Sequence, residues 1–333
     1  MTTVLITGSA GFIGYHLSQL LLDEGFDVVG LDSHNDYYDP KLKADREARL
    51  VARPGFTAIK GKLEDPGLLM KLFADFKPEV VVHLAAQAGV RYSIDNPRAY
   101  LEANLLGTFE LLEAARAHKP AHLLMASTSS VYGANTDMPY VETDKVDTQM
   151  SFYAATKKSN EVMAHSYSHL FDLPVTMFRF FTVYGPWGRP DMAPYLFTSA
   201  IFEKRPIKVF NHGDMKRDFT YVTDLVRGIR LLMDKVPDDT PVEGDSLSPV
   251  APWRVVNIGN GNSVQLMDFI SEIEKAAGIP AEKQMMPMQA GDVPATWADN
   301  NLLRRLTGYA PRTSVPDGVR AYVDWFRDYY QSE

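Results

Sequence analysis

The sequence predicts an α/β protein built on a doubly wound parallel sheet with helices on both faces, followed by a smaller mixed α/β domain. Short apolar runs alternate with amphipathic stretches as far as residue 181, and a glycine-rich turn follows the first run. Beyond residue 181 the alternation becomes irregular. Fully apolar strands that alternate with helices are typical of parallel sheets covered on both faces.

The alternation predicts the elements of the first half in order. The expected strands are the apolar runs 4–6, 27–31, 56–60, 80–85, 122–127 and 175–181. The expected helices are 12–25, 66–76, 96–119 and 151–171. In the helix 96–119, Asn96 is placed to cap the amino terminus, and Pro97 suits the first turn.

Beyond residue 181 the sequence predicts fewer helices and strands. The acidic, Pro- and Ser-rich stretch 236–252 is expected to be an exposed loop, and the amphipathic stretch 315–330 is expected to be a helix. We therefore expect a cofactor-binding domain over 1–181, to which the chain returns around 218–236. The remainder, 182–333, is expected to form mainly the substrate-binding domain.

Composition excludes several classes of function. The formal net charge of -8 argues against a nucleic-acid partner, because phosphate backbones favour an excess of Lys and Arg. The absence of cysteine excludes disulfides, thiolate metal sites and cysteine nucleophiles, and fits a reducing compartment. No stretch reaches the ~20 apolar residues that cross a membrane, and the first residues do not resemble a signal peptide. We expect a cytoplasmic protein with no membrane partner.

The segment VLITGSAGFIGYHL places Gly8, Gly11 and Gly14 between an expected strand and an expected helix. Such a pattern can be merely a tight turn, but in this context it also lets a pyrophosphate approach the helix amino terminus. Asp32 ends the second strand, where a carboxylate accepts hydrogen bonds from ribose hydroxyls and repels a 2′-phosphate. The pattern predicts a Rossmann site for NAD rather than NADP.

Tyr153 and Lys157 lie four residues apart in SFYAATKKSN, on one face of an expected helix. This spacing also occurs on many ordinary helices. A tyrosine of pKa about 10 is a poor base at neutral pH, and a nearby lysine and a cationic nicotinamide ring both favour its phenolate. Thr128 ends the preceding strand and can hydrogen-bond the same substrate oxygen. Together they predict a base, its electrostatic partner and an orienting hydroxyl.

Four hydroxyl side chains stand in a row in MASTSSVYG, where an apolar strand ends. A polar turn is one interpretation, since Ser and Thr are common in loops. The other is a group of hydrogen-bond donors around one anionic or carbonyl group. These residues are Ser127, Thr128, Ser129 and Ser130.

These motifs resemble the extended short-chain dehydrogenase/reductase family along nearly the whole chain. The resemblance rests on TGSAGFIG, HLAAQAGVRYSIDNP, STSSVYG, YAATK and RDFTYVTD. Further segments, among them DSHNDYYD, AGVRYSI and the long loop RFFTVYGPWGRPDMA, resemble UDP-glucuronate 4-epimerases. One departure is Lys62, because family members usually carry an Asp there, close to the adenine; the adenine contact stays unassigned.

The resemblance implies a set of site residues. Thr128, Tyr153 and Lys157 would be catalytic, with Tyr153 and Lys157 also contacting NAD. Further cofactor contacts would come from Gly8, Gly11, Phe12, Ile13, Gly14, Asp32, Ala85, Asn104 and Phe180. Substrate contacts would come from Ser129, Ser130, Thr182 and Arg189 at the sugar, and from Arg217 and Asp292 at the nucleotide.

The activity that the resemblance implies is the interconversion of UDP-glucuronate and UDP-galacturonate through a transient 4-keto sugar, with NAD tightly bound. Such an intermediate is a β-keto acid that can lose CO₂, and hydroxyl donors from Thr128 to Ser130 and from Thr182 would hold its carboxylate out of the reactive alignment. Rival enzymes of similar sequence differ at these positions. UDP-galactose 4-epimerases carry Asn at Thr182, decarboxylases carry Glu at Ser130, and dehydratases carry an Asp-Glu pair at Ser129 and Ser130.

Other readings of the sequence remain open. A second UDP-sugar epimerase, a UDP-glucuronate decarboxylase and a non-catalytic NAD-binding sensor are the alternatives. His165 and His169 are four apart on one helix but lack the Glu of a zinc motif and a third ligand, so no metal is expected. The resemblance implies a homodimer formed by the helices 96–119 and 151–171.

Overall fold

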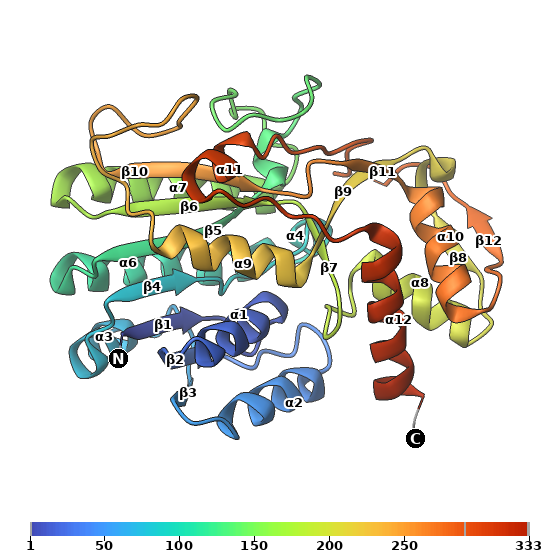
Figure 1. Cartoon of the computed structure of the whole chain (residues 1–333), viewed down its shortest axis with the longest axis horizontal. Coiled ribbons are helices and arrows are strands. Elements are labelled where there is room, and N and C mark those ends of the chain that lie inside the picture. The colour runs from blue at the N-terminus through green and yellow to red at the C-terminus, as the bar shows by residue number, and fades with distance from the viewer. Residues whose placement is uncertain (1, 290, 332–333) are drawn as a thin grey trace.

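A seven-stranded parallel sheet forms the centre of the computed structural model, which describes residues 2–289 and 291–331 (Figure 1). Its strand order is β10-β6-β5-β4-β1-β2-β3, and each neighbouring pair is parallel. The order reverses between β1 and β4, where open sheets of this type bind ligands at the carboxyl ends of their strands. The predicted doubly wound fold is confirmed. The strands are β1 (Thr3–Thr7), β2 (Asp27–Asp32), β3 (Phe56–Lys60), β4 (Val80–His83), β5 (His122–Thr128), β6 (Val175–Phe180) and β10 (Trp253–Ile258).

Helices cover both faces of this sheet, because successive strand residues point to opposite sides. In β1, Val4 and Ile6 pack into one core with α1, α9 and α11, whereas Leu5 packs into a second core with α3, α6 and α7. These helical elements are α1 (Phe12–Asp23), α2 (Pro40–Val51), α3 (Leu68–Phe76), α4 (Tyr92–Asp95), α5 (Pro97–Tyr100), η1 (Leu101–Leu106), α6 (Gly107–His118), η2 (Ser129–Tyr132), α7 (Phe152–Phe171), α9 (Val222–Met233) and α11 (Asn301–Thr307).

A smaller group of strands and helices lies beyond the carboxyl ends of the sheet, at the right of Figure 1. It contains a three-stranded sheet, β11-β9-β7, and the pair β12-β8. Its own core includes Phe219 and Phe269, which stack with ring centroids 3.9 Å apart. The elements are β7 (Thr182–Tyr184), α8 (Ala193–Phe202), β8 (Ile207–Val209), η3 (Phe210–Gly213), β9 (Lys216–Tyr221), β11 (Ser263–Gln265), α10 (Leu266–Ala277), β12 (Lys283–Met285) and α12 (Val315–Tyr330).

The structure differs from the predicted elements at three places. The helix 96–119 is interrupted by η1, a π-helical segment, and Asn96 donates to the Tyr92 hydroxyl (2.8 Å) instead of capping the helix. The helix α2 was not predicted, because its charged sequence lacks a strong apolar stripe. The strand β10 was not predicted as part of the sheet, since it follows the long loop 236–252.

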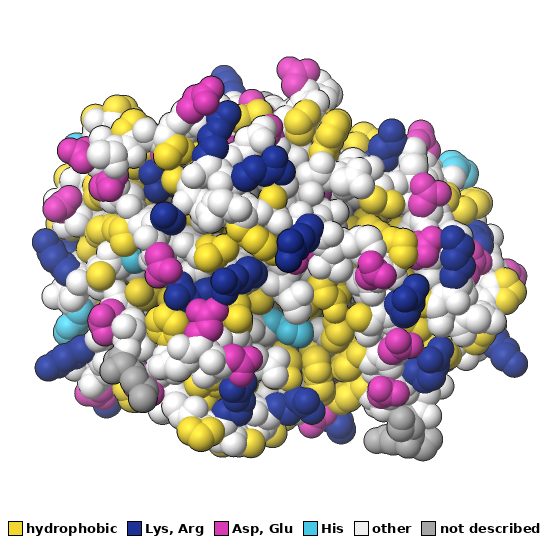
Figure 2. Space-filling model, viewed as in Figure 1, with side chains coloured by type: hydrophobic (Ala, Val, Ile, Leu, Met, Phe, Trp, Pro, Cys, Tyr) yellow, Lys and Arg dark blue, Asp and Glu magenta, His cyan; other side chains and the backbone are white. Residues whose placement is uncertain are grey.

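The surface carries both signs of charge. On the face shown in Figure 2, acidic and basic side chains are interspersed rather than gathered into one field. Within residues 2–289 and 291–331, no helix has the length and apolar character needed to span a membrane.

Candidate active site

The glycine-rich turn lies at the carboxyl end of β1 and packs too closely for larger residues. Gly8 has φ +77°, and a Cβ on it would lie 2.8 Å from the backbone nitrogen of Ala85. A Cβ on Gly14 would lie 2.1 Å from the carbonyl oxygen of Gly8. The helix α1 begins directly after Gly11 without a side-chain cap, so its first N–H groups are available to an anion. This cradle fits the pyrophosphate of a dinucleotide.

Asp32 lies beside this turn at the end of β2. Its Oδ1 accepts a hydrogen bond from the backbone nitrogen of His34 (2.9 Å) and lies 3.5 Å from the Nζ of Lys43. Lys43 also donates to the side chain of Asn35 (2.9 Å). The buried carboxylate is thereby held in a fixed position at the end of β2.

Lys62, the departure from the family pattern, follows β3 and is exposed. Its backbone nitrogen donates to Asp65 Oδ2 (2.9 Å), which closes a turn. Leu63 is buried, and a Cβ on Gly107 would lie 2.6 Å from the Cβ of Leu63. The carboxylate at this point therefore comes from Asp65, which is engaged by the Lys62 backbone, and not from residue 62 itself.

Tyr153 and Lys157 lie on one face of α7, whose amino terminus is capped by Ser151 accepting from Ala154 (3.1 Å). The Lys157 Nζ donates to the carbonyl oxygen of Ala126 in β5 (2.9 Å). Burial lowers the pKa of Lys157 to about 8. Lys157 is therefore held against the strand that ends at Thr128.

Burial and two neighbouring groups shift the pKa of the Tyr153 hydroxyl. Burial raises its pKa, and this is opposed by the cation of Arg189 and by a hydrogen bond with the Thr128 side chain. The structure thus brings Tyr153 and Thr128 together, as predicted. It also brings Arg189 close enough to favour the phenolate, which the sequence did not indicate.

The four consecutive hydroxyls do not act as one group. Ser127 and Thr128 point to opposite faces of β5, because side chains alternate along a strand. Ser127 is buried and donates to Glu161 Oε1 (2.7 Å), behind the site. Thr128 Oγ1 donates to Ser130 Oγ (3.2 Å) and accepts from the Ser130 backbone nitrogen (3.2 Å). Thr128, Ser129 and Ser130 remain as neighbouring hydroxyls at the start of η2.

The strand β6 and the following segment supply the next predicted residues. Phe180 ends β6 and packs into the core that contains α1, and Thr182 begins β7. Arg189 Nε donates to Asp191 Oδ1 (3.0 Å), and Asp191 also accepts from the Tyr37 hydroxyl (3.0 Å). The segment that carries Arg189 is therefore joined to the loop that follows β2.

Asn104 lies in η1 and uses its side chain to join two segments of the chain. Its Oδ1 accepts from the Gln87 backbone nitrogen (2.8 Å), while its Nδ2 donates to the Gln87 carbonyl oxygen (3.0 Å) and to Thr156 Oγ1 (3.1 Å). Asn104 thus fixes the segment after β4 against α7. Among the other predicted cofactor residues, Ala85 donates its N–H to Thr7 Oγ1 (3.2 Å), and Phe12 and Ile13 open α1.

Arg217 and Asp292 meet although they lie 75 positions apart, with Arg217 Nη2 and Asp292 Oδ1 at 3.0 Å. Arg91 lies on the other side of the same carboxylate, with its Nη2 3.8 Å from Asp292 Oδ2. Burial lowers the pKa of Arg217, and Asp292 partly offsets this effect. Two arginines and one aspartate from three segments therefore form a polar group that suits a nucleotide diphosphate.

His165 and His169 contact different groups rather than one centre. His165 Nε2 lies 2.9 Å from Ser248 Oγ, and His169 Nδ1 lies 2.7 Å from the carbonyl oxygen of Val250. Both histidines therefore join α7 to the loop 236–252.

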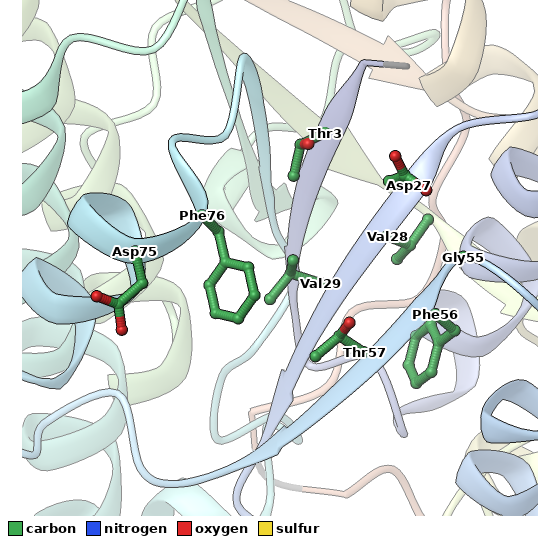
Figure 3. Close-up of a pocket in the computed structure, with 9 residues that line it drawn as sticks. All are labelled: Thr3, Asp27, Val28, Val29, Gly55, Phe56, Thr57, Asp75 and Phe76. Carbon is green, nitrogen blue, oxygen red and sulfur yellow. The ribbon is translucent and has the colours of Figure 1, made fainter.

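A surface hollow of about 360 Å³ lies away from these residues, at the amino ends of β1, β2 and β3 (Figure 3). Val29, Thr57 and Phe76 line it, together with the carboxylates of Asp27 and Asp75. Because the glycine turn, Asp32 and Thr128 lie at the opposite ends of the strands, this hollow is not part of the candidate active site.

Comparisons with known proteins show which family the chain is similar to. The family model described as GDP-mannose 4,6 dehydratase matches residues 5–322. A protein of Rhizobium meliloti (strain 1021) named probable UDP-glucuronate 4-epimerase is 52% identical over 332 residues, covering 98% of this chain and 97% of that protein. UDP-glucuronate 4-epimerase 4 of Arabidopsis thaliana is 44% identical over 336 residues, covering 99% of this chain and 76% of that protein. The crystal structure of Bacillus cereus UDP-glucuronic acid 4-epimerase with UDP-glucuronic acid and NAD has a TM-score of 0.88 at 34% identity, covering 99% of this chain and all of that one.

Proposed function

The chain belongs to the extended short-chain dehydrogenase/reductase family that the GDP-mannose 4,6 dehydratase model describes, and we propose that it is an NAD-dependent UDP-glucuronate 4-epimerase. The observation that carries this proposal is the grouping of Thr128, Tyr153 and Lys157 at the carboxyl end of β5, on the same edge of the sheet as the glycine turn. An enzyme that moves a proton and a hydride at one carbon needs a base beside the cofactor, and this grouping supplies it.

Thr128, Tyr153 and Lys157 are the proposed catalytic residues. Tyr153 removes the proton from the sugar 4-hydroxyl and later returns it, while Thr128 orients the same oxygen. Lys157, held by the Ala126 carbonyl, keeps its ammonium beside the tyrosine and the cofactor ribose. NAD held in this site would supply a reversible hydride acceptor for C4 of the sugar.

The cofactor site that we propose lies at the carboxyl ends of β1 and β4, where the strand order of the sheet reverses. Its backbone cradle consists of Gly8, Gly11 and Gly14, and Asp32 accepts from the adenosine ribose. The remaining proposed contacts come from Phe12, Ile13, Ala85, Asn104, Tyr153, Lys157 and Phe180. Since the Asn104 amide is engaged with Gln87 and Thr156, its contribution is to shape the site.

The hydroxyls at the sugar end distinguish this proposal from a decarboxylase. A 4-keto glucuronate loses CO₂ when its carboxylate bond stands parallel to the carbonyl π system. Ser129, Ser130 and Thr182 are proposed to donate to the carboxylate and to hold it away from that alignment. Ser127 is not part of this group, because it contacts Glu161.

The nucleotide end is proposed to bind through Arg217 and Asp292, with Arg189 nearer to the sugar. Arg91 joins this group by its place beside Asp292. We further propose the division of labour expected from the sequence, with NAD held mainly by 1–181 and the returning stretch 218–236, and the UDP-sugar mainly by 182–333.

A homodimer and a cytoplasmic location are proposed as well. Leu101 in η1, Phe109 in α6, and Val162 and Leu170 in α7 are exposed although they are apolar, and α6 contacts α7. Exposed apolar side chains on neighbouring helices favour pairing with a second copy. Light scattering should give twice the chain mass, and Val162→Glu with Leu170→Glu should give the monomer.

Cell fractionation tests the proposed cytoplasmic location, which the lack of cysteine supports.

Product analysis tests the proposed function. Purified protein is incubated with UDP-glucuronate, without added reductant, and followed by proton NMR. A mixture of UDP-glucuronate and UDP-galacturonate is expected. UDP-pentose with released CO₂ would instead identify a decarboxylase, and turnover of UDP-galactose alone would identify a different epimerase. Tyr153→Phe serves as the inactive control.

A further inference from the structure

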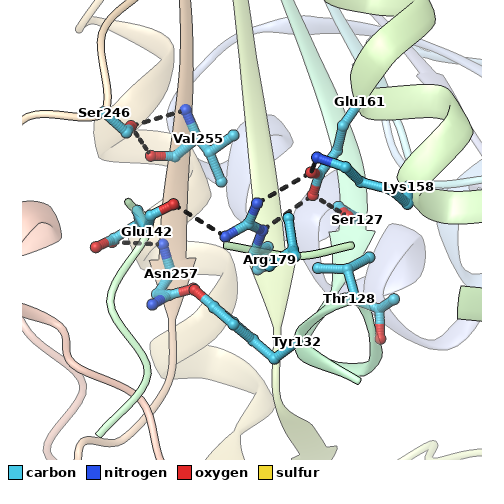
Figure 4. Close-up of polar contacts among 12 residues, drawn as sticks. Ser127, Thr128, Tyr132, Glu142, Lys158, Glu161, Arg179, Ser246, Val255 and Asn257 are labelled. Atoms are coloured by element: carbon cyan, nitrogen blue, oxygen red, sulfur yellow. Dashed lines mark hydrogen bonds and ion pairs between the residues drawn. The ribbon is translucent and has the colours of Figure 1, made fainter. Parts of the chain in front are cut away.

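A buried ion pair lies behind the candidate catalytic residues (Figure 4). Arg179 in β6 donates through Nε to Glu161 Oε1 (3.0 Å) and through Nη2 to Glu161 Oε2 (3.0 Å). The two side chains are only 3% and 1% exposed. A bidentate pair of this kind fixes the orientation of both side chains as well as their distance.

Glu161 shares one face of α7 with Tyr153 and Lys157, because the three residues are spaced four apart. Each of them lies against one of three consecutive residues of β5. Lys157 Nζ binds the carbonyl oxygen of Ala126 (2.9 Å), and Glu161 accepts from the Ser127 hydroxyl (2.7 Å). The Thr128 side chain lies close enough to Tyr153 to lower its pKa. The link between Ser127 and Glu161 therefore lies next to the contact on which the chemistry depends.

Arg179 supports the other side of the hydroxyl segment. Its guanidinium lies 4.8 Å from the ring centre of Tyr132 in η2, and its Nη1 donates to the carbonyl oxygen of Glu142 (3.1 Å). Tyr132 is fixed in turn by donating to Asn257 Oδ1 (2.8 Å). The segment from Ser127 to Tyr132 thus lies between Glu161 at one end and Arg179 at the other.

A buried ion pair is a poor way to gain stability, since the loss of hydration offsets most of the attraction between the charges. An apolar pair of similar volume would hold α7 on the sheet as well. Although burial acts to raise it, Arg179 and Ser127 keep the pKa of Glu161 below its ordinary value, so the carboxylate stays ionised. What the ion pair adds is a defined geometry.

We propose that Glu161 and Arg179 are positioning residues, which set the place of Thr128 relative to the Tyr153 hydroxyl through Ser127 and Tyr132. This inference rests on the proposed function, because it assigns these two residues to the same reaction. Neither residue touches the substrate or the cofactor in this assignment.

Glu161→Gln tests the proposal with little change of shape. A misplacement of about 1 Å can cost about 10²-fold in rate, so kcat should fall at least ~10-fold. KM for UDP-glucuronate should stay within about threefold, because the substrate contacts remain. The amount of NAD retained by the purified protein should not change. If Glu161→Gln fails to fold, Ser127→Ala should still lower kcat about threefold or more at unchanged KM.

Asp245→Asn is the matched control. Asp245, in the loop before β10, forms a bidentate pair with Arg254, and both contacts measure 2.9 Å. The pair is as buried as that of Glu161 and Arg179, since the Asp245 side chain is 1% exposed and the Arg254 side chain 3%. The Asp245→Asn substitution should lower the melting temperature about as much as Glu161→Gln does, and it should leave kcat unchanged. Equal losses of kcat in the two variants, or an unchanged kcat in Glu161→Gln, would overturn the proposal.

Hydrogen exchange of the NAD-loaded protein separates this inference from the proposed function. In Glu161→Gln, exchange should rise in residues 127–132, and in Asp245→Asn it should not. A parent protein that leaves UDP-glucuronate unchanged would refute the proposed function only. Unchanged exchange in 127–132 would refute the positioning role whatever the substrate.

Discussion

At the scale of single residues, the proposed chemistry is assigned to Thr128, Tyr153 and Lys157, with Arg189 and Glu161 as neighbours of this group. Thr128, Tyr153 and Lys157 were predicted as a group, because a helix and the end of a strand fix their relation locally. Arg189 near Tyr153 and Glu161 behind Ser127 were not predicted. Glu161 lies 34 positions from Ser127, and their contact depends on how α7 settles on the sheet.

Arg189→Met should move the acid limb of the kcat–pH profile to higher pH. The Arg189 cation lowers the pKa of Tyr153, so its removal raises that pKa and leaves less phenolate at a given pH. The measurement is kcat at saturating UDP-glucuronate from neutral to alkaline pH. A limb at the same pH in parent and variant would show that Arg189 acts on binding alone.

Thr182→Val should increase the share of decarboxylated product. The substitution keeps the shape and removes one donor to the carboxylate, and a lost donor of this kind costs about 1–3 kcal/mol. The ratio of UDP-pentose to UDP-galacturonate by NMR gives the result. A lower rate without UDP-pentose would assign Thr182 to a different task.

At the scale of elements, periodicity predicted the strands and helices of the sheet but not their irregularities. The strand 56–60 was predicted with its observed limits, and β1, β2 and β5 within one residue at each end. The π-helical segment η1 was missed, since an apolar stripe of ordinary spacing continues through it. The helix α2 was missed because two of its four buried residues, Lys43 and Arg46, are charged and so do not add to an apolar stripe.

Asn104→Ala should destabilise the protein by about 1–3 kcal/mol and reduce the NAD retained. The change leaves the Gln87 backbone groups without their side-chain partner at the segment that follows β4. Thermal unfolding with and without added NAD provides the test. Asn96→Ala, which removes only a contact with the partly buried Tyr92, is the control and should have a smaller effect.

At the scale of the molecule, the doubly wound sheet and the family resemblance were predicted from the sequence and are confirmed. The return of the chain to the sheet was predicted only in part. Residues 218–236 were expected to return, and α9 does pack on α1. The strand β10 lies still further along the chain, and it pairs with β6 only after the loop 236–252 has crossed over. Long-range pairing of this kind leaves no local pattern.

His122→Asn should make stability less sensitive to acid. Burial, the largest influence, lowers the pKa of His122 in the folded protein to about 4 from 6.5. Between these values the unfolded chain binds more protons, so stability falls as the pH falls from 6.5 to 4. Without this group the loss over that range should be smaller by roughly 1–3 kcal/mol. Urea unfolding at several pH values measures the free energy of unfolding of each protein. If that free energy falls equally with pH in parent and variant, the proposed effect of burying His122 is contradicted.

The most direct test of the central claim, inversion at C4 with the carboxylate retained, uses UDP-glucuronate that carries deuterium at C4. The proposed site removes the hydride and returns it within one closed cycle. UDP-galacturonate formed in ordinary water should therefore keep both its deuterium at C4 and its carboxylate, as seen by mass spectrometry and NMR. Loss of the deuterium to solvent, or a product that has lost CO₂, would contradict the claim.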